Sequence, residues 1–234
     1  MTIYFEERPS DSPLIEQIWR SSSTTTGPFI STANVYWMLV VCRYRGKTKV
    51  TVRGPETLST TAYALEHGFN DEETSFLGIV FKPGIFMPHL PPGIVADQSL
   101  TLPEGVGKSF RLYGSTWEFP TFDNVDTFIT RLMRTDMLVQ DPVVAAALQG
   151  QAAGLTQRTM QKRFLRATGI SHNAFRQIER ANQAFRILQQ GTSILDTVYS
   201  LGYFDQPHLT RSLKRLMGQT PAQIARSIPV PVAG

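Results

Sequence analysis

The sequence has only one cysteine, Cys42, among its 234 residues. A single thiol cannot close an internal disulfide or build a cysteine-rich zinc site, so a reducing, cytoplasmic location is expected. No apolar run approaches the ~18 residues of a membrane span. Glu6, Glu7 and Arg8 interrupt the region where a signal peptide would need its apolar core, so secretion is not expected.

The net charge is also small, at +4. With 18% charged and 41% apolar residues, the composition is ordinary for a soluble globular protein. The average hides a division near residue 140. Residues 1–140 carry 12 Lys and Arg against 15 Asp and Glu, a net of −3, whereas residues 141–234 carry 11 against 4, a net of +7. All three tryptophans lie in the first part. We therefore expect two domains of different chemistry, residues 1–138 and 139–234.

The first part contains short runs rich in β-branched and aromatic residues, each bounded by Gly or Pro turn signals. These runs are 35–44, 48–53, 57–65 and 74–82. Their spacing predicts a small antiparallel barrel or sandwich. A helix is predicted over 124–138, leading out of the domain. Another is predicted to begin at Ser12, with one apolar face made of Leu14, Ile15, Ile18 and Trp19.

The second part has helical periodicity throughout, with Gly and Pro mostly at the boundaries. The predicted helices cover about 143–148, 156–168, 171–190, 193–201, 205–217 and 220–228. The long helix over 171–190 is predicted to bury Ala174, Ile178, Ala181, Phe185 and Leu188.

Two of these helices combine an apolar back with a basic front. The backs are Met160, Phe164 and Ala167 in the helix over 156–168, and Leu209, Leu213 and Leu216 in the helix over 205–217. A basic helix that follows a tight turn suits the major groove of DNA, and a solvated face on an ordinary helical bundle is the alternative. A connecting helix of about 20 residues would be ~30 Å long, close to the ~34 Å of one DNA turn.

Three motifs accompany these helices. A Gly-Leu-Thr-Gln-Arg run begins at Gly154, and a Gly-Tyr-Phe-Asp-Gln run at Gly202 precedes Thr210-Arg211 and Lys214-Arg215. Gly218-Gln219-Thr220-Pro221 then follows. At these offsets, residues 141–227 resemble the C-terminal DNA-binding domain of the AraC/XylS family of transcription regulators. The resemblance implies two helix-turn-helix units joined by a long helix, each placing one helix in the major groove.

The resemblance also implies roles for individual side chains. Base-facing positions of the family are matched by Arg158, Gln161, Lys162, Gln206, His208, Thr210 and Arg211. Phosphate contacts, which position the protein without reading sequence, are assigned to Arg163, Arg166, Arg180, Lys214 and Arg215. Gly150 weakens the first helix of the first helix-turn-helix unit by ~1 kcal/mol. That helix-turn-helix unit is therefore expected to contribute mainly affinity for DNA.

The β-rich part resembles the small cupin-like sensor domains attached to such regulators. The similar segments are Pro13–Glu16 with Trp19, Tyr36–Val40 and Phe81–Gly84. In this interpretation the domain binds a small-molecule effector or a second copy of the chain. Candidate residues for an effector pocket are Trp37, Tyr63, Phe81, Phe86 and Trp117, and an aromatic core is the alternative explanation for them.

A cupin-fold enzyme is the rival hypothesis from another class. Its metal site needs a His-x-His pair with a later Glu and His, and this part has only His67 and His89. Metal catalysis is therefore disfavoured, and no metal or other cofactor is expected. Cys42 lies in an apolar run, where a buried thiol stays protonated and inert.

The sequence predicts an α+β protein that is not an enzyme but a sequence-specific DNA-binding transcription regulator. Its expected partners are double-stranded DNA, a small-molecule effector, a second copy in a homodimer, and RNA polymerase. The second hypothesis is an effector-binding or protein-interaction module that binds DNA only weakly. No pattern in the sequence distinguishes an activator from a repressor.

Overall fold

The computed structural model describes residues 3–23, 28–63, 74–151 and 154–226. Packing divides the chain into two compact units. Unit 1 consists of segments 1–26, 36–55 and 65–171, and unit 2 consists of segments 27–35, 56–64 and 172–234. Within the described ranges, no helix is both long and apolar enough to cross a membrane.

Unit 1 is built on a six-stranded antiparallel sheet. In spatial order its strands are β1 (Ile3–Arg8), β2 (Ile15–Ser23), β7 (Thr74–Phe81), β4 (Met38–Tyr44), β5 (Lys47–Arg53) and β9 (Ser99–Thr101). The predicted strands over 35–44, 48–53 and 74–82 are confirmed. The sheet is open, with β1 and β9 at its edges, so the fold is β-rich as predicted without closing into a barrel.

One face of this sheet carries the core of unit 1. The fully buried side chains on it include Ile18, Leu39, Val41, Leu77 and Ile79. The core is completed by α1 (Val125–Arg134) and by the hairpin of β10 (Ser109–Leu112) and β11 (Ser115–Glu118). The predicted helix over 124–138 is thus confirmed in type, but it ends at Arg134 and packs on the core instead of leading away.

The predicted helix that begins at Ser12 is wrong, because strand β2 occupies this region. Ile15 pairs with Phe81 and Ile18 with Ile79, but the register shifts between Ile15 and Gln17. That irregularity, typical of a β-bulge, lets two residues three positions apart face the same core. The three-residue spacing of Ile15 and Ile18 is therefore the same as on one side of a helix, although both side chains are buried against a sheet.

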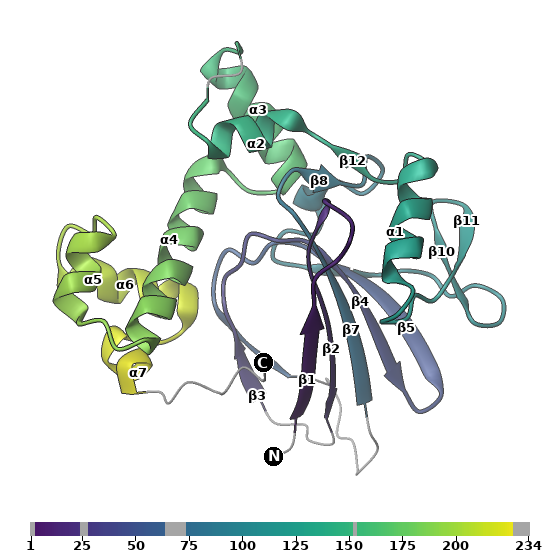
Figure 1. Ribbon diagram of the computed structural model, residues 1–234, viewed down its shortest axis with the longest axis horizontal. Helices are drawn as coiled ribbons and strands as arrows, with labels where there is room; N and C mark the ends of the chain where they lie inside the picture. Colours follow the sequence, from purple (N-terminus) through teal and green to yellow (C-terminus); the bar gives the residue numbers. More distant parts are fainter. Residues whose placement is uncertain (1–2, 24–27, 64–73, 152–153, 227–234) are drawn as a thin grey trace. The chain divides into compact units, whose positions relative to one another are not determined.

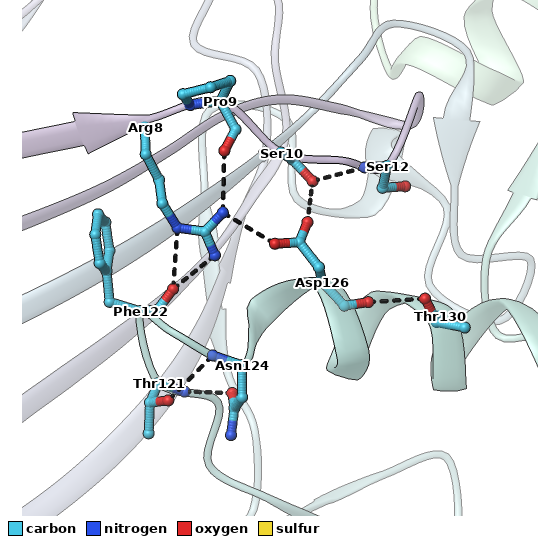
Figure 2. A network of polar contacts seen from close by, with 9 residues as sticks. All are labelled: Arg8, Pro9, Ser10, Ser12, Thr121, Phe122, Asn124, Asp126 and Thr130. Atoms are coloured by element: carbon cyan, nitrogen blue, oxygen red, sulfur yellow. Dashed lines mark hydrogen bonds and ion pairs between the residues drawn. The ribbon is translucent and has the colours of Figure 1, made fainter.

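A polar network fastens the end of β1 to α1 (Figure 2). The Arg8 guanidinium donates to the Asp126 carboxylate at 2.9 Å and to the Phe122 carbonyl at 2.7 Å. Ser10 donates to the other oxygen of Asp126. Burial alone raises the pKa of Asp126, but these hydrogen bonds outweigh it and lower the pKa below its ordinary value. The network holds the first turn of α1 against the sheet edge.

The last segments of unit 1 are helical and pack on its loops. A short pairing of β8 (Ile85–Phe86) with β12 (Val139–Gln140) leads into α2 (Pro142–Leu148), which packs against α3 (Gln157–Thr168). The short helix η1 (Pro92–Ile94) also contacts α3. At the end of α3, a Cβ added to Gly169 would lie 2.8 Å from the carbonyl carbon of Pro92, so only glycine permits this approach.

The described residues of unit 2 form four helices and a two-stranded ribbon. The helices are α4 (His172–Gln189), α5 (Ile194–Ser200), α6 (Gln206–Met217) and α7 (Pro221–Arg226), with α4 packed against the other three (Figure 1). The ribbon pairs β3 (Pro28–Ser31) with β6 (Thr60–Tyr63), which confirms a strand within 57–65. Helix α4 buries Phe175, Ile178, Ala181, Ala184 and Leu188. The predicted Ala174 and Phe185 are only half-buried.

The predicted boundary between residues 138 and 139 was placed from composition. The units defined by packing have their boundaries at other positions. Helices α2 and α3 belong to unit 1 with the large sheet, and the β3–β6 ribbon belongs to unit 2 with the last four helices. The division into a sensor domain and a DNA-binding domain stays a prediction about function.

Candidate nucleic-acid interface

Helix α3 presents a basic face. Thr156 caps its start by accepting from the Thr159 backbone N–H, and Gly169 ends it in the left-handed conformation, both at the predicted positions. Phe164 and Ala167 are buried as predicted, and Met160 is half-buried. The exposed side chains include Arg158, Gln161, Lys162 and Arg166. Because positions 158, 161 and 162 are three and four residues apart, they share one side of the helix.

Arg163 on the same helix is held by a carboxylate of its own unit. Its Nε lies 3.0 Å from one oxygen of Asp141 and its guanidinium donates to the other at 2.7 Å. Asp141 also caps α2 by accepting from the Val143 backbone N–H at 2.9 Å. The two-point geometry joins α3 to the start of α2, which favours a structural role for Arg163 over the predicted phosphate contact.

Helix α6 presents the second basic face. Asp205 caps it by accepting from the His208 backbone N–H at 2.7 Å, and Gly218 follows it at a φ of 72°. Leu209, Leu213 and Leu216 are buried as predicted. The exposed side chains include Gln206, Arg211, Lys214 and Arg215, while Thr210 is half-buried. Because the apolar side of α6 is buried, these four polar or basic side chains are exposed on its other side.

The turn before α6 engages two residues that were predicted to contact DNA. The Phe204 backbone N–H donates to Nδ1 of His208 at 3.3 Å, and the His208 ring lies edge-on to Tyr203. The Arg180 guanidinium stacks 4.4 Å from the Tyr203 ring centre and donates to the Gly202 carbonyl. Both side chains support the turn, and this geometry favours positioning roles for them.

Sequence reasoning missed exposed apolar side chains beside both helices. Leu165 follows Gln161 by one turn of α3 and is 49% exposed. Phe204, just before the cap of α6, is 91% exposed, and Tyr199 on α5 is 79% exposed. The spacing of four residues from Gln161 was the signal that could have placed Leu165 on the basic side of α3, because residues four apart share one side of a helix.

Four of the five aromatic residues proposed to line an effector pocket lie in the core of unit 1. Trp37 stacks on Phe81 with ring centres 4.0 Å apart and donates through its indole nitrogen to the Ile85 carbonyl. Phe86 is buried, and Trp117 packs edge-on against Phe128. The side chain of Tyr63 lies outside the described residues. For these four described residues the packing favours the aromatic-core explanation, and none of the four lines the large cavity of unit 1.

That cavity opens where the core-facing side of the sheet becomes polar. Leu77 pairs with Arg20 and Val41, and Ser75 pairs with Ser22 and Arg43. Since directly paired residues point to the same face, the apolar face continues into these polar side chains. The cavity has a volume of about 1690 Å³ and is also lined by the 104–109 loop, residues between 116 and 124, and Arg131. Among the described residues that line it, six are Lys or Arg and three are Asp or Glu.

Of the two histidines weighed as metal ligands, only His89 lies within the described residues. His89 stacks on Tyr113 with ring centres 3.5 Å apart, and His67 lies outside the described residues. In the part of the chain that the structure describes, no three His, Cys, Asp or Glu side chains are grouped to hold a metal ion. Burial raises the pKa of the Cys42 thiol above its ordinary value, although Lys49 opposite it acts in the other direction.

Comparison with known proteins bears on the C-terminal region. Residues 150–227 match the family model of the helix-turn-helix domain. The HTH-type transcriptional regulator RipA of Corynebacterium glutamicum is 31% identical over 88 residues, which cover 37% of this chain and 27% of that relative. The chain therefore spans about a quarter of the length of the curated relative that it matches.

Two solved structures of ToxT from Vibrio cholerae are also similar over most of the chain. One covers 94% of this chain and 97% of its own at 8% identity, with a TM-score of 0.41. The other, ToxT bound to (E)-4-(8-methylnaphthalen-1-yl)but-3-enoic acid, covers 94% and 98% at 9% identity, with a TM-score of 0.42.

The capped helices, the glycine turns and the family match define residues 150–227 as a helix-turn-helix domain. Together with its relative, this match confirms the resemblance of the C-terminal region to the AraC/XylS type.

Proposed function

We propose that the protein is a sequence-specific DNA-binding transcription regulator rather than an enzyme. The observation that carries the proposal is the pair of basic faces on α3 and α6, each on a helix with a buried apolar back inside the helix-turn-helix domain. Double-stranded DNA is the partner that such faces fit, because base edges and phosphates both accept hydrogen bonds from them. We propose that this activity takes place in the cytoplasm, where a bacterial regulator has access to DNA.

Within this proposal the exposed side chains divide into two groups. Arg158, Gln161, Lys162, Gln206 and Arg211 are assigned to base edges, and half-buried Thr210 is a shorter-reaching contact of the same kind. Arg166, Lys214 and Arg215 are assigned to phosphates. Leu165 is added as an apolar contact for a thymine methyl group. Helix α4 has 18 residues, about 27 Å, which supports contact with successive major grooves.

Selection from random DNA followed by binding assays tests the proposal. We expect one enriched motif, with affinity that falls steeply as salt rises. Arg211→Ala should lose about 1–3 kcal/mol of discrimination at one base pair, and Arg158→Ala should do so at another. Arg186→Ala, on neither α3 nor α6, is the matched control and should leave discrimination unchanged. Enrichment of no motif would contradict the proposal and favour a module that binds DNA weakly.

We further propose that unit 1 senses a small molecule with an anionic group. The support is the cavity over the polar end of the sheet, where cationic side chains outnumber anionic ones two to one. Arg43 is the best-placed anchor, because it rises from the middle of the sheet and its guanidinium is oriented by the Pro120 carbonyl at 3.0 Å. The apolar neighbours Phe119 and Phe122 suit an aromatic or aliphatic body.

A thermal-shift screen with aromatic and aliphatic carboxylic acids tests the sensor proposal. Arg43→Met should abolish the stabilisation by any acid that binds. Lys49→Met is the matched control, because Lys49 pairs with Cys42 and faces the other side of the sheet. If the same acid stabilises Arg43→Met as well as the unchanged protein, the cavity is not its site. Assembly as a homodimer and contact with RNA polymerase remain proposals that rest on the resemblance alone.

A further inference from the structure

The end of α6 is held by backbone from the N-terminal half of the sequence. The Ala33 backbone N–H donates to the Leu216 carbonyl at 2.7 Å, and the Ser59 backbone N–H donates to the Arg215 carbonyl at 3.0 Å. The Ser59 hydroxyl donates to the same Arg215 carbonyl at 3.0 Å. These donors come from segments 27–35 and 56–64, which contain the β3–β6 ribbon and belong to unit 2.

The contact has the features of a fixed interface. The last carbonyls of any helix lack partners within the helix, and here Ala33 and Ser59, which flank the two strands of the ribbon, supply donors to two of them. Gly218 allows the approach, since a Cβ on it would lie 2.8 Å from the Cγ2 atom of Ile30. The ribbon itself is braced, because Asn34 and Glu56 exchange backbone hydrogen bonds at 2.9 and 3.0 Å. Ala33 is fully buried.

We infer that the β3–β6 ribbon is a positioning element of unit 2, which holds the end of α6 in place through the flanking residues Ala33 and Ser59. The inference rests on the proposed function, in which α6 reads bases. Arg215 and Leu216, whose carbonyls the ribbon holds, directly follow Lys214 and lie one turn beyond Arg211. A shift of this end therefore changes the angle at which Arg211 meets a base edge, while the affinity contributed by α3 stays unchanged.

Base discrimination in the full-length protein tests the inference. Ser59→Pro removes both donors to the Arg215 carbonyl, and Ser59→Ala removes only the hydroxyl. We expect Ser59→Pro to reduce discrimination about tenfold at the base pair that Arg211→Ala identifies, since two hydrogen bonds are lost. Discrimination at the base pair that Arg158→Ala identifies should change by less than about twofold. Ser59→Ala should have an intermediate effect, and Thr60→Ala, its neighbour without a bond to α6, should have none.

Equal losses at both base pairs, or a loss at neither, would overturn the inference. A merely structural role would lower both together. Hydrogen exchange on the unchanged protein supplies a test that needs neither DNA nor the variant to fold. The Ala33 and Ser59 amides should exchange at the slow rates of the α6 amides, and fast exchange at these two positions would also overturn the inference. If the amides are protected but no DNA motif is found, the proposed function fails and the ribbon contact stands.

Discussion

Gly169 offers a direct measurement of how closely α3 approaches the η1 loop. It combines a φ of 81° with the contact to Pro92 and Gly93, whose backbone atoms would lie 2.8–2.9 Å from an added Cβ. Backbone atoms cannot swing aside as a side-chain end can. The substitution Gly169→Ala therefore meets two penalties, one from the left-handed conformation and one from the clash.

A second glycine separates these penalties. Gly150, just after α2, has a φ of 72° and no heavy atom within 4 Å of an added Cβ. Gly150→Ala should therefore cost only the conformational term, about 1 kcal/mol. Gly169→Ala should cost that term and a further 1–3 kcal/mol of overpacking, about 2–4 kcal/mol in all. For a unit of this size the expected losses in Tm are about 2–4 °C and about 4–16 °C.

Tryptophan fluorescence is the appropriate assay, because Trp19, Trp37 and Trp117 all lie in unit 1 together with both glycines. Each variant is melted in the full-length protein and compared with the unchanged chain. If the two variants lose the same Tm, η1 does not approach Gly169 as closely as described. If Gly150→Ala is the more damaging, the reasoning about both glycines is wrong.

Three further predictions concern single side chains. Asp126 has a lowered pKa, so the stability it contributes is present above its unfolded pKa of about 3.9 and is lost as pH falls through the folded value. The curve of stability against pH should therefore be flatter below about pH 4 for Asp126→Asn than for the unchanged protein. An unchanged curve would contradict this prediction. Cys42, with its raised pKa, should react with iodoacetamide more slowly than a free thiol at pH 8, and Lys49→Met should slow it further. Arg163→Met should lower the free energy of unfolding by about 1 kcal/mol without changing the salt dependence of DNA binding, whereas Arg166→Met should reduce that slope by about 1; a reduced slope for Arg163→Met would restore its phosphate role.

Local signals predicted most of the helical elements. The caps Thr156 and Asp205 and the terminating Gly169 and Gly218 stand where the sequence placed them, because capping depends on neighbouring backbone groups alone. The buried and exposed sides of α3 and α6 followed for the same reason. The bulge in β2 could not be predicted, since it depends on the register of a partner strand some 60 positions away in the sequence.

Partner identity was the part of the site that sequence alone left undetermined. Arg163 and Arg180 have the residue type and helix position of phosphate contacts, and only the fold shows that Asp141 and the Gly202 turn engage them. Helix α4 also departs from its predicted buried side. Phe175 and Ala184 are buried in place of the predicted Ala174 and Phe185, on a helix that packs against α5, α6 and α7.

The order of segments in unit 2 has a consequence for how such a chain can be recombined. The chain passes between the two units five times, at residues 26/27, 35/36, 55/56, 64/65 and 171/172. A regulator joined by one linker can exchange its sensor by a single crossover. Here a single crossover at 35/36, 55/56, 64/65 or 171/172 would separate part or all of the β3–β6 ribbon from the helix whose end it holds. Functional chimaeras should therefore require that segments 27–35 and 56–64 be inherited together with residues 172–234.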